Sequence, residues 1–299
     1  MSSIKISIFT PTYNRAFSIH RVFESLQKQT YRNFEWIVVD DGSTDNTETL
    51  IKEYKKNADF DIIYYWQKNQ GKHVAINKGT SLASGELFSI VDSDDYIISN
   101  ALELFIYYYT KIKKDSTIAG LSFPIVTKSG EFLTKNFIQK ELICNSFDLS
   151  YKFKVSGEMA KVMKLEIMRN FPFPQFTNEK FCPESLIWKR IALSYKLYFI
   201  NNPLYIGEYL EHGISSNYWE NMKKSPQTAI LYFTEMSNYK KIPLKTRLFT
   251  LENYWKFSNV NTSLSFFEKL KKVPFFLSIY VIIRFYFKSF SNKVKNNKS

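Results

Sequence analysis

An acidic cluster follows a continuous apolar segment in the first third of the chain. Residues 87–91 read Leu-Phe-Ser-Ile-Val, and Asp92, Ser93, Asp94 and Asp95 follow directly. A strand buried on both faces has such a sequence, but its interior cannot hold several ionised carboxylates. They must lie just past its carboxyl end, where open α/β sheets bind ligands. Asp92 and Asp94 point to the same side of extended chain and can converge on Mn²⁺ or Mg²⁺ carrying a diphosphate. The alternative is a solvated acidic turn.

A second candidate for phosphate chemistry is the lysine at position 72. Residues 69–73 read Asn-Gln-Gly-Lys-His and introduce a helix with apolar residues at positions 75, 76 and 82. A helix N-terminus favours anions because its free N–H groups and its dipole point there. Lys72 is therefore placed to approach a diphosphate, although a solvated lysine would explain the same pattern.

Strand-like and helix-like segments alternate over the first 115 residues and would position these groups. Strands are expected at 4–9, 35–39, 61–66 and 87–91, with helices between them at 19–26, 47–54 and 72–82. This alternation predicts an α/β fold with a parallel sheet covered by helices on both faces. The first strand should end at Phe9, before a loop over 10–15. Because that loop lacks glycine, it is neither a dinucleotide-binding nor a Walker loop.

Four motifs occur in order within this region. They are Phe9-Thr10-Pro11-Thr12-Tyr13-Asn14-Arg15, Val38-Val39-Asp40-Asp41-Gly42-Ser43-Thr44-Asp45, Asn69-Gln70-Gly71 with Ala75-Ile76-Asn77-Lys78-Gly79, and Asp92-Ser93-Asp94-Asp95. The ordered set resembles family 2 glycosyltransferases of the GT-A fold, which is Rossmann-like with a mainly parallel central sheet and flanking helices. The resemblance implies that residues 1–115 bind a nucleotide-sugar donor together with a divalent metal.

The resemblance also implies roles for the matching residues. The expected donor contacts are Thr10, Pro11, Tyr13, Arg15, Asp40, Asp41, Lys72, Asp92 and Ser93. Asp94 is the expected ligand of Mn²⁺ or Mg²⁺, and Asp92 would contact the ribose or the metal. Simpler readings remain open, because Pro11 could merely end a strand and Asp41-Gly42 could merely form a turn.

Residues 116–217 should form the acceptor side of a catalytic domain that covers 1–217. Strands are expected at 119–126, 157–163, 197–200 and 205–209, helices at 165–168 and 184–191, and a turn at 127–131 with a return strand at 132–134. Family members carry an acidic pair before a hydrophobic helix, and one of its carboxylates is the catalytic base. The matching pair is Glu184-Ser185, so Glu184 is the expected base and Glu179 the reserve. Alternatively, Glu184 only stabilises the helix N-terminus.

The segment 211–217 resembles the family's loop that closes over the donor. His212 stands where an Asp often occurs, so it is a candidate contact for the metal or the diphosphate, or simply a loop residue. The chain has only 3 histidines and 2 cysteines, Cys144 and Cys182, without metal-binding spacing. A zinc site is therefore not expected, and both thiols should be reduced.

The positive charge of the chain is concentrated near its C-terminus. The net charge is +13, and residues 221–299 contain 15 Lys or Arg and 3 Glu, which leaves only +1 for the first 220 residues. A uniformly basic nucleic-acid binder would not partition its charge in this way, so nucleic acid is not an expected partner. Residues 218–299 should form a helical, basic, amphipathic extension of the catalytic domain.

Residues 273–287 are the most apolar part of this extension and have lysines on both flanks. The segment is short for a membrane span, and Arg284 interrupts it. We expect it to lie in a membrane interface with its basic flanks on anionic lipid; packing on the catalytic domain or a partner subunit is the alternative. No signal peptide is expected, so the expected location is the cytoplasm, peripherally attached to the inner face of the cell membrane.

These expectations describe an inverting, metal-dependent glycosyltransferase with a UDP-sugar donor and a glycan or lipid-linked acceptor, in surface polysaccharide or lipopolysaccharide synthesis. Two alternatives remain. A non-catalytic, membrane-associated scaffold would keep the fold without the chemistry. A sugar nucleotidyltransferase would open with a glycine-rich loop containing Arg and Lys, which residues 10–15 lack.

Overall fold

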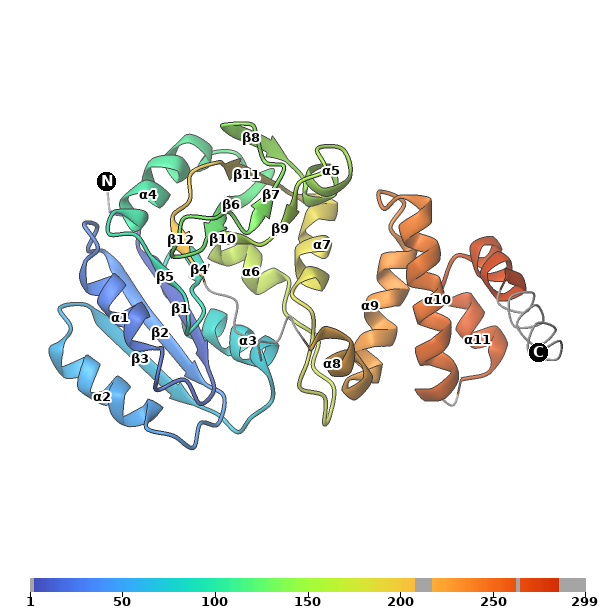
Figure 1. Cartoon of the computed structure of the whole chain (residues 1–299), viewed down its shortest axis with the longest axis horizontal. Coiled ribbons are helices and arrows are strands. Elements are labelled where there is room, and N and C mark those ends of the chain that lie inside the picture. The colour runs from blue at the N-terminus through green and yellow to red at the C-terminus, as the bar shows by residue number, and fades with distance from the viewer. Residues whose placement is uncertain (1–2, 208–216, 262–263, 285–299) are drawn as a thin grey trace. The chain divides into compact units, whose positions relative to one another are not determined.

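The computed structural model describes residues 3–207, 217–261 and 264–284 of the chain. The chain divides into two compact units, Met1–Asn217 and Tyr218–Ser299. The first unit contains the sheet with its helices, and the described part of the second is helical (Figure 1).

One mixed sheet forms the framework of the first unit, in the order β3-β2-β1-β4-β10-β6-β11-β8. Its parallel part comprises β3 (Asp61–Trp66), β2 (Phe34–Asp40), β1 (Ile6–Thr12) and β4 (Leu87–Ile90). Beyond it, β10 (Met159–Lys164) is antiparallel to β4 and β6 (Ile118–Val126), β11 (Lys196–Ile200) is parallel to β6, and β8 (Glu141–Cys144) is antiparallel to β11. The predicted α/β fold with a mainly parallel centre is confirmed.

Three short pairings complete the strands of this unit. The strand β12 (Tyr205–Ile206) pairs in parallel with β6 and antiparallel with β5 (Tyr96–Ile97). A separate two-stranded sheet contains β7 (Thr134–Lys135) and β9 (Ser156–Gly157). Residues 208–209 of the expected strand at 205–209 lie outside the described residues.

Helices cover both faces of the parallel strands (Figure 1). The helices of the first unit are α1 (His20–Gln27), α2 (Thr47–Asn57), α3 (Lys72–Leu82), α4 (Ala101–Ile112), α5 (Ser146–Tyr151), α6 (Leu165–Asn170) and α7 (Ser185–Ser194). Alternate residues of β1 point to opposite faces. Ile6 and Ile8 join Leu26 of α1 in the hydrophobic core, whereas the ring of Phe9 lies against Gly79 of α3, where an added Cβ would come within 2.3 Å of it. Glycine at position 79 therefore allows α3 to lie close to the sheet.

The first strand is longer than predicted, and the expectation of a loop directly after Phe9 was wrong. Phe9 O accepts the N–H of Val91 on the β4 side (2.9 Å), whereas Thr12 O accepts the N–H of Asp41 on the β2 side (2.8 Å). Because main-chain groups alternate in direction, Pro11 N faces the side on which β4 has ended. No ladder partner is lost there, so the strand tolerates proline.

The expected return of the chain at 132–134 is present only in part, since Leu133 N–H donates to Ile125 O of β6 at 2.9 Å. The turn is present, because Thr127 N–H donates to Glu131 O at 2.8 Å. However, Phe132 forms only an isolated bridge with Val126, and Thr134 already belongs to β7, which pairs with β9. Sequence spacing identified the turn but not the partner of the segment that follows it.

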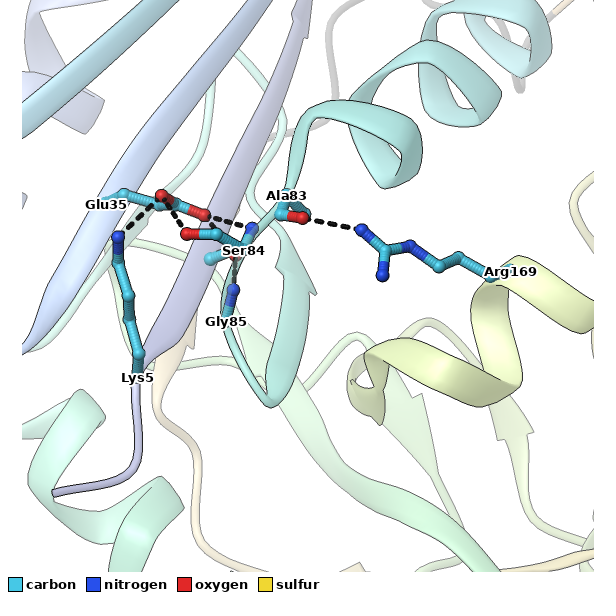
Figure 2. A network of polar contacts seen from close by, with 7 residues as sticks. Lys5, Glu35, Ala83, Ser84, Gly85 and Arg169 are labelled. Atoms are coloured by element: carbon cyan, nitrogen blue, oxygen red, sulfur yellow. Dashed lines mark hydrogen bonds and ion pairs between the residues drawn. The ribbon is translucent and has the colours of Figure 1, made fainter. Parts of the chain in front are cut away.

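A buried polar network fixes the amino end of the parallel strands (Figure 2). The carboxylate of Glu35 accepts hydrogen bonds from Ser7 Oγ (2.6 Å), Ser84 N (2.6 Å) and Ser84 Oγ (2.7 Å), and pairs with Lys5 Nζ (2.8 Å). Burial alone would raise the pKa of Glu35, but these contacts hold it below its usual value. Arg169 of α6 donates to Ala83 O at 2.6 Å, so the same region also ties α6 to the end of α3.

The second unit contains α8 (Tyr218–Lys224), α9 (Pro226–Asn238), α10 (Leu244–Asn261) and α11 (Phe266–Lys271), and residues 275–284 are also helical. Phe233, Leu251, Tyr254, Leu270 and Val281 are buried in it. The helical C-terminal region was predicted correctly. In the described parts of the chain, no helix combines the length and the apolar character that crossing a membrane requires.

Candidate active site

The loops that follow β1 and β2 are joined by hydrogen bonds at the carboxyl edge of the sheet. Asn14 has a positive φ of 52°, and its N–H donates to Ser43 Oγ at 2.8 Å. Its side-chain oxygen accepts the N–H of Thr44 at 2.8 Å, and Ala16 N–H donates to Asp45 Oδ2 at 3.0 Å. The left-handed backbone that Asn tolerates well therefore turns one loop back onto the other.

Asp40 ends β2 and organises the loop that follows. Its carboxylate is fully buried and accepts the N–H of Ser43 (2.7 Å) and the hydroxyl of Tyr64 (2.8 Å). Burial and this bond to Asp40 raise the pKa of Tyr64, so the phenol remains a neutral donor. Both oxygens of Asp40 are therefore held by groups of the protein itself.

Asp41 fixes the segment that leads into α3. It accepts hydrogen bonds from Gln67 Nε2 (2.8 Å), Gln70 N (2.8 Å) and Gly71 N (2.7 Å). Gly71 has a φ of +98°, and an added Cβ would lie 2.0 Å from Lys180 O. Glycine is required on both counts, because L side chains avoid this backbone region and the neighbouring main chain fills the space. The first turn of α3 is thereby held against the segment that precedes α7.

Lys72, the first residue of α3, joins two carboxylates from distant parts of the sequence. Its Nζ lies 2.7 Å from Asp92 Oδ2 and 2.8 Å from Glu184 Oε1. The three side chains retain 25%, 38% and 34% of their accessible surface, respectively, so they can be reached from solvent. Asp92 follows β4, and Glu184 immediately precedes α7. The ends of three elements therefore meet at one ammonium group.

This arrangement keeps the carboxyl group of Glu184 ionised. Burial alone would raise its pKa, but the ammonium groups of Lys72 and Lys161 and a hydrogen bond from Trp188 hold the pKa below the usual value. Glu184 is thus an ionised, partly accessible carboxylate at the edge of the site. Glu179, the other candidate base, is 7% exposed.

The acidic cluster has the properties expected of a cation site. Asp92 Oδ1 is buried without a hydrogen-bond partner. Burial, followed by the charges of Asp92 and Asp94, raises the pKa of Asp95 to about 8. A divalent cation would satisfy the orphaned oxygen and relieve the repulsion, so the residues present fit such an ion. Within the described ranges, no group of three or more His, Cys, Asp or Glu is arranged to hold a metal.

The other predicted donor residues differ in accessibility. Tyr13 is 49% exposed, and the guanidinium of Arg15 lies 5.5 Å from the ring of Phe17. Thr10 is fully buried, and its Oγ1 accepts a hydrogen bond from Trp36 Nε1 at 2.9 Å. The hydroxyl of Thr10 therefore supports the end of β1.

Three further residues were predicted to contact the donor or the metal. Pro11 and Ser93 are buried, so neither presents its side chain freely to solvent. His212 lies outside the described residues, and its predicted contact with the metal stays a prediction.

Sequence reasoning missed Lys161 and Trp188, which adjoin Glu184. Lys161 is on β10, and its Nζ lies 4.8 Å from the centroid of the Trp188 ring on α7. A lysine between alanine and valine in a strand was the only signal available for Lys161. Trp188 lies one helical turn after Glu184, and that spacing could have identified it.

The family model "Glycosyl transferase family 2" matches residues 7–164. Glycosyltransferase GlyG of Streptococcus pneumoniae serotype 4 is 30% identical over 210 residues, which are 67% of this chain and 69% of that protein. The GalNAc(5)-diNAcBac-PP-undecaprenol beta-1,3-glucosyltransferase of Campylobacter jejuni is 31% identical over 62% of this chain and 58% of its own length.

Among solved structures, S. aureus TarS 1-349 in complex with UDP-GlcNAc has a similar fold, with a TM-score of 0.65 and 20% sequence identity. The match covers 91% of this chain and 82% of that one. At this level of identity the likeness concerns the fold alone.

Proposed function

We propose a reaction for this chain, which belongs to glycosyltransferase family 2 and is a glycosyltransferase. It transfers a sugar from a UDP-sugar to an acceptor hydroxyl with inversion of configuration. The observation that carries the proposal is the contact of Lys72 with both Asp92 and Glu184. Through this contact the candidate base Glu184 lies close to Asp92, which belongs to the acidic cluster that would hold the metal.

The residues of the site have distinct roles in this proposal. Glu184 is ionised, and it accepts the proton of the acceptor hydroxyl as the oxygen attacks the anomeric carbon. Attack from the face opposite the diphosphate inverts the configuration through an oxocarbenium-like state. Lys72 lies between the base and the acidic cluster, where its ammonium can also attract diphosphate oxygens. Mn²⁺ or Mg²⁺ held by Asp94, with Asp92 beside it, would neutralise the charge that develops on the leaving diphosphate.

The donor and acceptor classes are drawn from the relatives. The structure of TarS contains UDP-GlcNAc, and the name of the Campylobacter relative specifies a diphosphate-linked undecaprenol acceptor. We therefore assign a UDP-sugar as donor and a glycan or lipid-linked glycan as acceptor, in the synthesis of a surface polysaccharide.

Peripheral attachment to the inner face of the cell membrane completes the proposal. Phe267, Phe275, Phe276 and Tyr280 of the second unit are 72%, 54%, 85% and 54% exposed, respectively. The unit that carries these aromatic side chains also carries most of the net positive charge of the chain. Aromatic anchors beside basic residues suit an anionic lipid surface, where a lipid-linked acceptor would be found.

The test of the proposed base is Glu184→Gln. We expect release of UDP from a panel of UDP-sugars to fall by roughly two orders of magnitude or more, because the amide cannot accept the proton. The affinity for UDP with Mn²⁺, measured by calorimetry, should stay close to that of wild type. Glu166→Gln on α6, an exposed position, is the matched control. Wild-type turnover by Glu184→Gln together with loss in Glu179→Gln would assign the base to Glu179.

A further inference from the structure

Two lysines in the neighbourhood of α7, Lys161 and Lys189, form no direct ion pair with a carboxylate in the described part of the chain. Lys161 Nζ donates to Met159 O at 3.0 Å and lies 4.8 Å from the Trp188 ring centroid. Lys189 Nζ is 3.4 Å from Ser146 O, and 4.8 Å and 5.4 Å from the rings of Phe147 and Tyr151. Both side chains are partly buried. Carbonyl oxygens and aromatic faces thus surround these two ammonium groups.

A partly buried cation without a direct ion pair is costly. Burial lowers the pKa of Lys161, although the charges of Glu184 and Glu158 act in the opposite direction, and burial followed by the charge of Lys161 lowers the pKa of Lys189 to about 8. By contrast, Lys5 and Lys72 each pair with carboxylates at 2.7–2.8 Å. An aromatic face stabilises a cation, but it does not replace an anion. The two unpaired lysines would therefore be stabilised by an anionic ligand.

Their location identifies which substrate could supply that anion. Trp188 and Lys189 follow Glu184 by about one turn of α7, and Lys161 lies close enough to Glu184 to help lower its pKa. In Figure 1, α5 and α7 lie on the opposite side of β10 and β6 from β1, β2 and β3, whose loops form the expected donor site. Lys161 is on β10 and Lys189 contacts residues of α5, so both lie away from the expected donor loops, and we take this as the acceptor side.

We propose that Lys161 and Lys189, here called the basic ledge, bind a phosphate group of the acceptor and so hold its hydroxyl beside Glu184. The inference rests on the proposed function, because it requires an acceptor at Glu184. Two sources share this chemistry, a lipid diphosphate and a phosphodiester within a polymer. Either would supply oxygens that form charge-assisted hydrogen bonds with two ammonium groups.

The test uses the full chain saturated with Mn²⁺ and UDP, which blocks the donor site. Geranyl diphosphate represents the lipid source, glycerophosphoglycerol represents the phosphodiester source, and geraniol is the uncharged control; binding is measured by calorimetry. We expect one of the two anionic probes to bind wild type and geraniol not to compete with it. The Lys161→Met/Lys189→Met variant should bind that probe at least tenfold more weakly, and its affinity for UDP should be unchanged.

Two further variants separate binding from a structural role. Lys161→Arg/Lys189→Arg should retain binding because it retains both charges, and Lys52→Met, an exposed lysine of α2, should behave as wild type. Because methionine removes an unpaired cation and still packs against Trp188, the double Met variant should melt no lower than wild type. A lower melting temperature with unchanged probe binding would show that the lysines are structural and overturn the proposal.

Failure of the basic ledge can be distinguished from failure of the transferase proposal. Equal binding of the anionic probe by wild type and the double Met variant would overturn the basic ledge alone. Wild type that binds UDP but neither anionic probe would do the same. Wild type that binds no nucleotide would remove the transferase proposal, and the basic ledge with it.

Discussion

At the scale of single residues, Lys72 connects the two halves of the proposed chemistry. It precedes Glu184 by 112 positions and Asp92 by 20 positions, yet its ammonium contacts both carboxylates. Without it, Asp92 and Glu184 would face each other as unpaired, partly buried charges, and the phosphate-binding cation would be lost. The residue thus has both a structural and a substrate-binding role.

Lys72→Met should therefore lower both stability and turnover. We expect unfolding to become easier by about 1–3 kcal/mol, because removal of one partner leaves desolvated charges. We expect UDP release from the donor to slow by roughly tenfold or more, which corresponds to about 1.4 kcal/mol of lost transition-state stabilisation. Chemical denaturation and a coupled UDP assay measure the two effects. Lys72→Arg should recover most of the stability, and a Met variant with wild-type turnover would limit Lys72 to a structural role.

The sequence indicated which residue types form the site but not which of them touch. Lys72 was expected to approach a diphosphate because it begins a helix, and Glu184 was expected to be a base because of a family motif. Nothing in their spacing predicts an ion pair, since it depends on the packing of the segment that precedes α7 against the start of α3. Thr10 is a second example. Its motif predicted a contact with the nucleotide-sugar, but nothing in the sequence indicated that its buried hydroxyl accepts a hydrogen bond from Trp36.

At the scale of elements, the parallel strands were predictable because hydrophobic runs and helix-capping residues alternate over the first hundred residues. The predictions failed for the end of β1 and for the segment after the turn at 127–131, where the structure depends on which strand pairs with which. Pro11 continues β1 because β4, the neighbour on the side that the proline nitrogen faces, has already ended. Thr134 belongs to β7 because it pairs with β9. Neither partner can be identified from a local pattern.

The network around Glu35 at the amino end of the sheet makes the stability of the fold depend on pH. The pKa of Glu35 is lowered in the folded chain from its usual value of 4.5. Its contribution to stability is therefore fully present above pH 4.5 and is lost as the pH falls through the lower, folded-state pKa. Glu35→Gln should lower stability at pH 7 by about 2 kcal/mol, because charge-assisted hydrogen bonds are lost.

Thermal melts of Glu35→Gln and wild type between pH 7 and pH 3 check this prediction. The difference between the two proteins should shrink below pH 4.5, whereas Glu24→Gln, an exposed position on α1, should differ little from wild type at any pH. A difference between Glu35→Gln and wild type that stays constant down to pH 3 would contradict the assigned pKa direction.

At the scale of the whole molecule, the two units have different proposed roles, catalysis for the first and membrane attachment for the second. The first contains the sheet and every predicted site residue that the structure describes. The second is helical and basic, and it presents aromatic side chains to solvent. Attachment of the second unit to a membrane would bring the first to acceptors held in that membrane.

Membrane attachment predicts a loss of vesicle binding when the exposed aromatic residues are changed. Phe276→Ser/Tyr280→Ser should reduce cosedimentation with vesicles of anionic phospholipid by tenfold or more, because two interfacial anchors are removed. The same change at Tyr107 of α4, which is also 55% exposed, is the control. Vesicles of neutral phosphatidylcholine should bind wild type more weakly, since the attraction of the basic unit is lost. Equal sedimentation of both variants and wild type would refute membrane attachment through this helix.

The proposed UDP-sugar donor and the role of Asp94 as metal ligand are tested most directly by a thermal-shift screen. It compares UDP, GDP, CDP and TDP, each with and without Mn²⁺, on wild type and Asp94→Ala. Binding to the folded state raises the melting temperature, and the rise grows with ligand concentration. UDP should stabilise wild type only when Mn²⁺ is present, and it should not stabilise Asp94→Ala. If no nucleotide stabilises wild type under any condition, the chain does not use the proposed donor site. Metal-dependent stabilisation that persists in Asp94→Ala would contradict the assignment of that carboxylate to the metal.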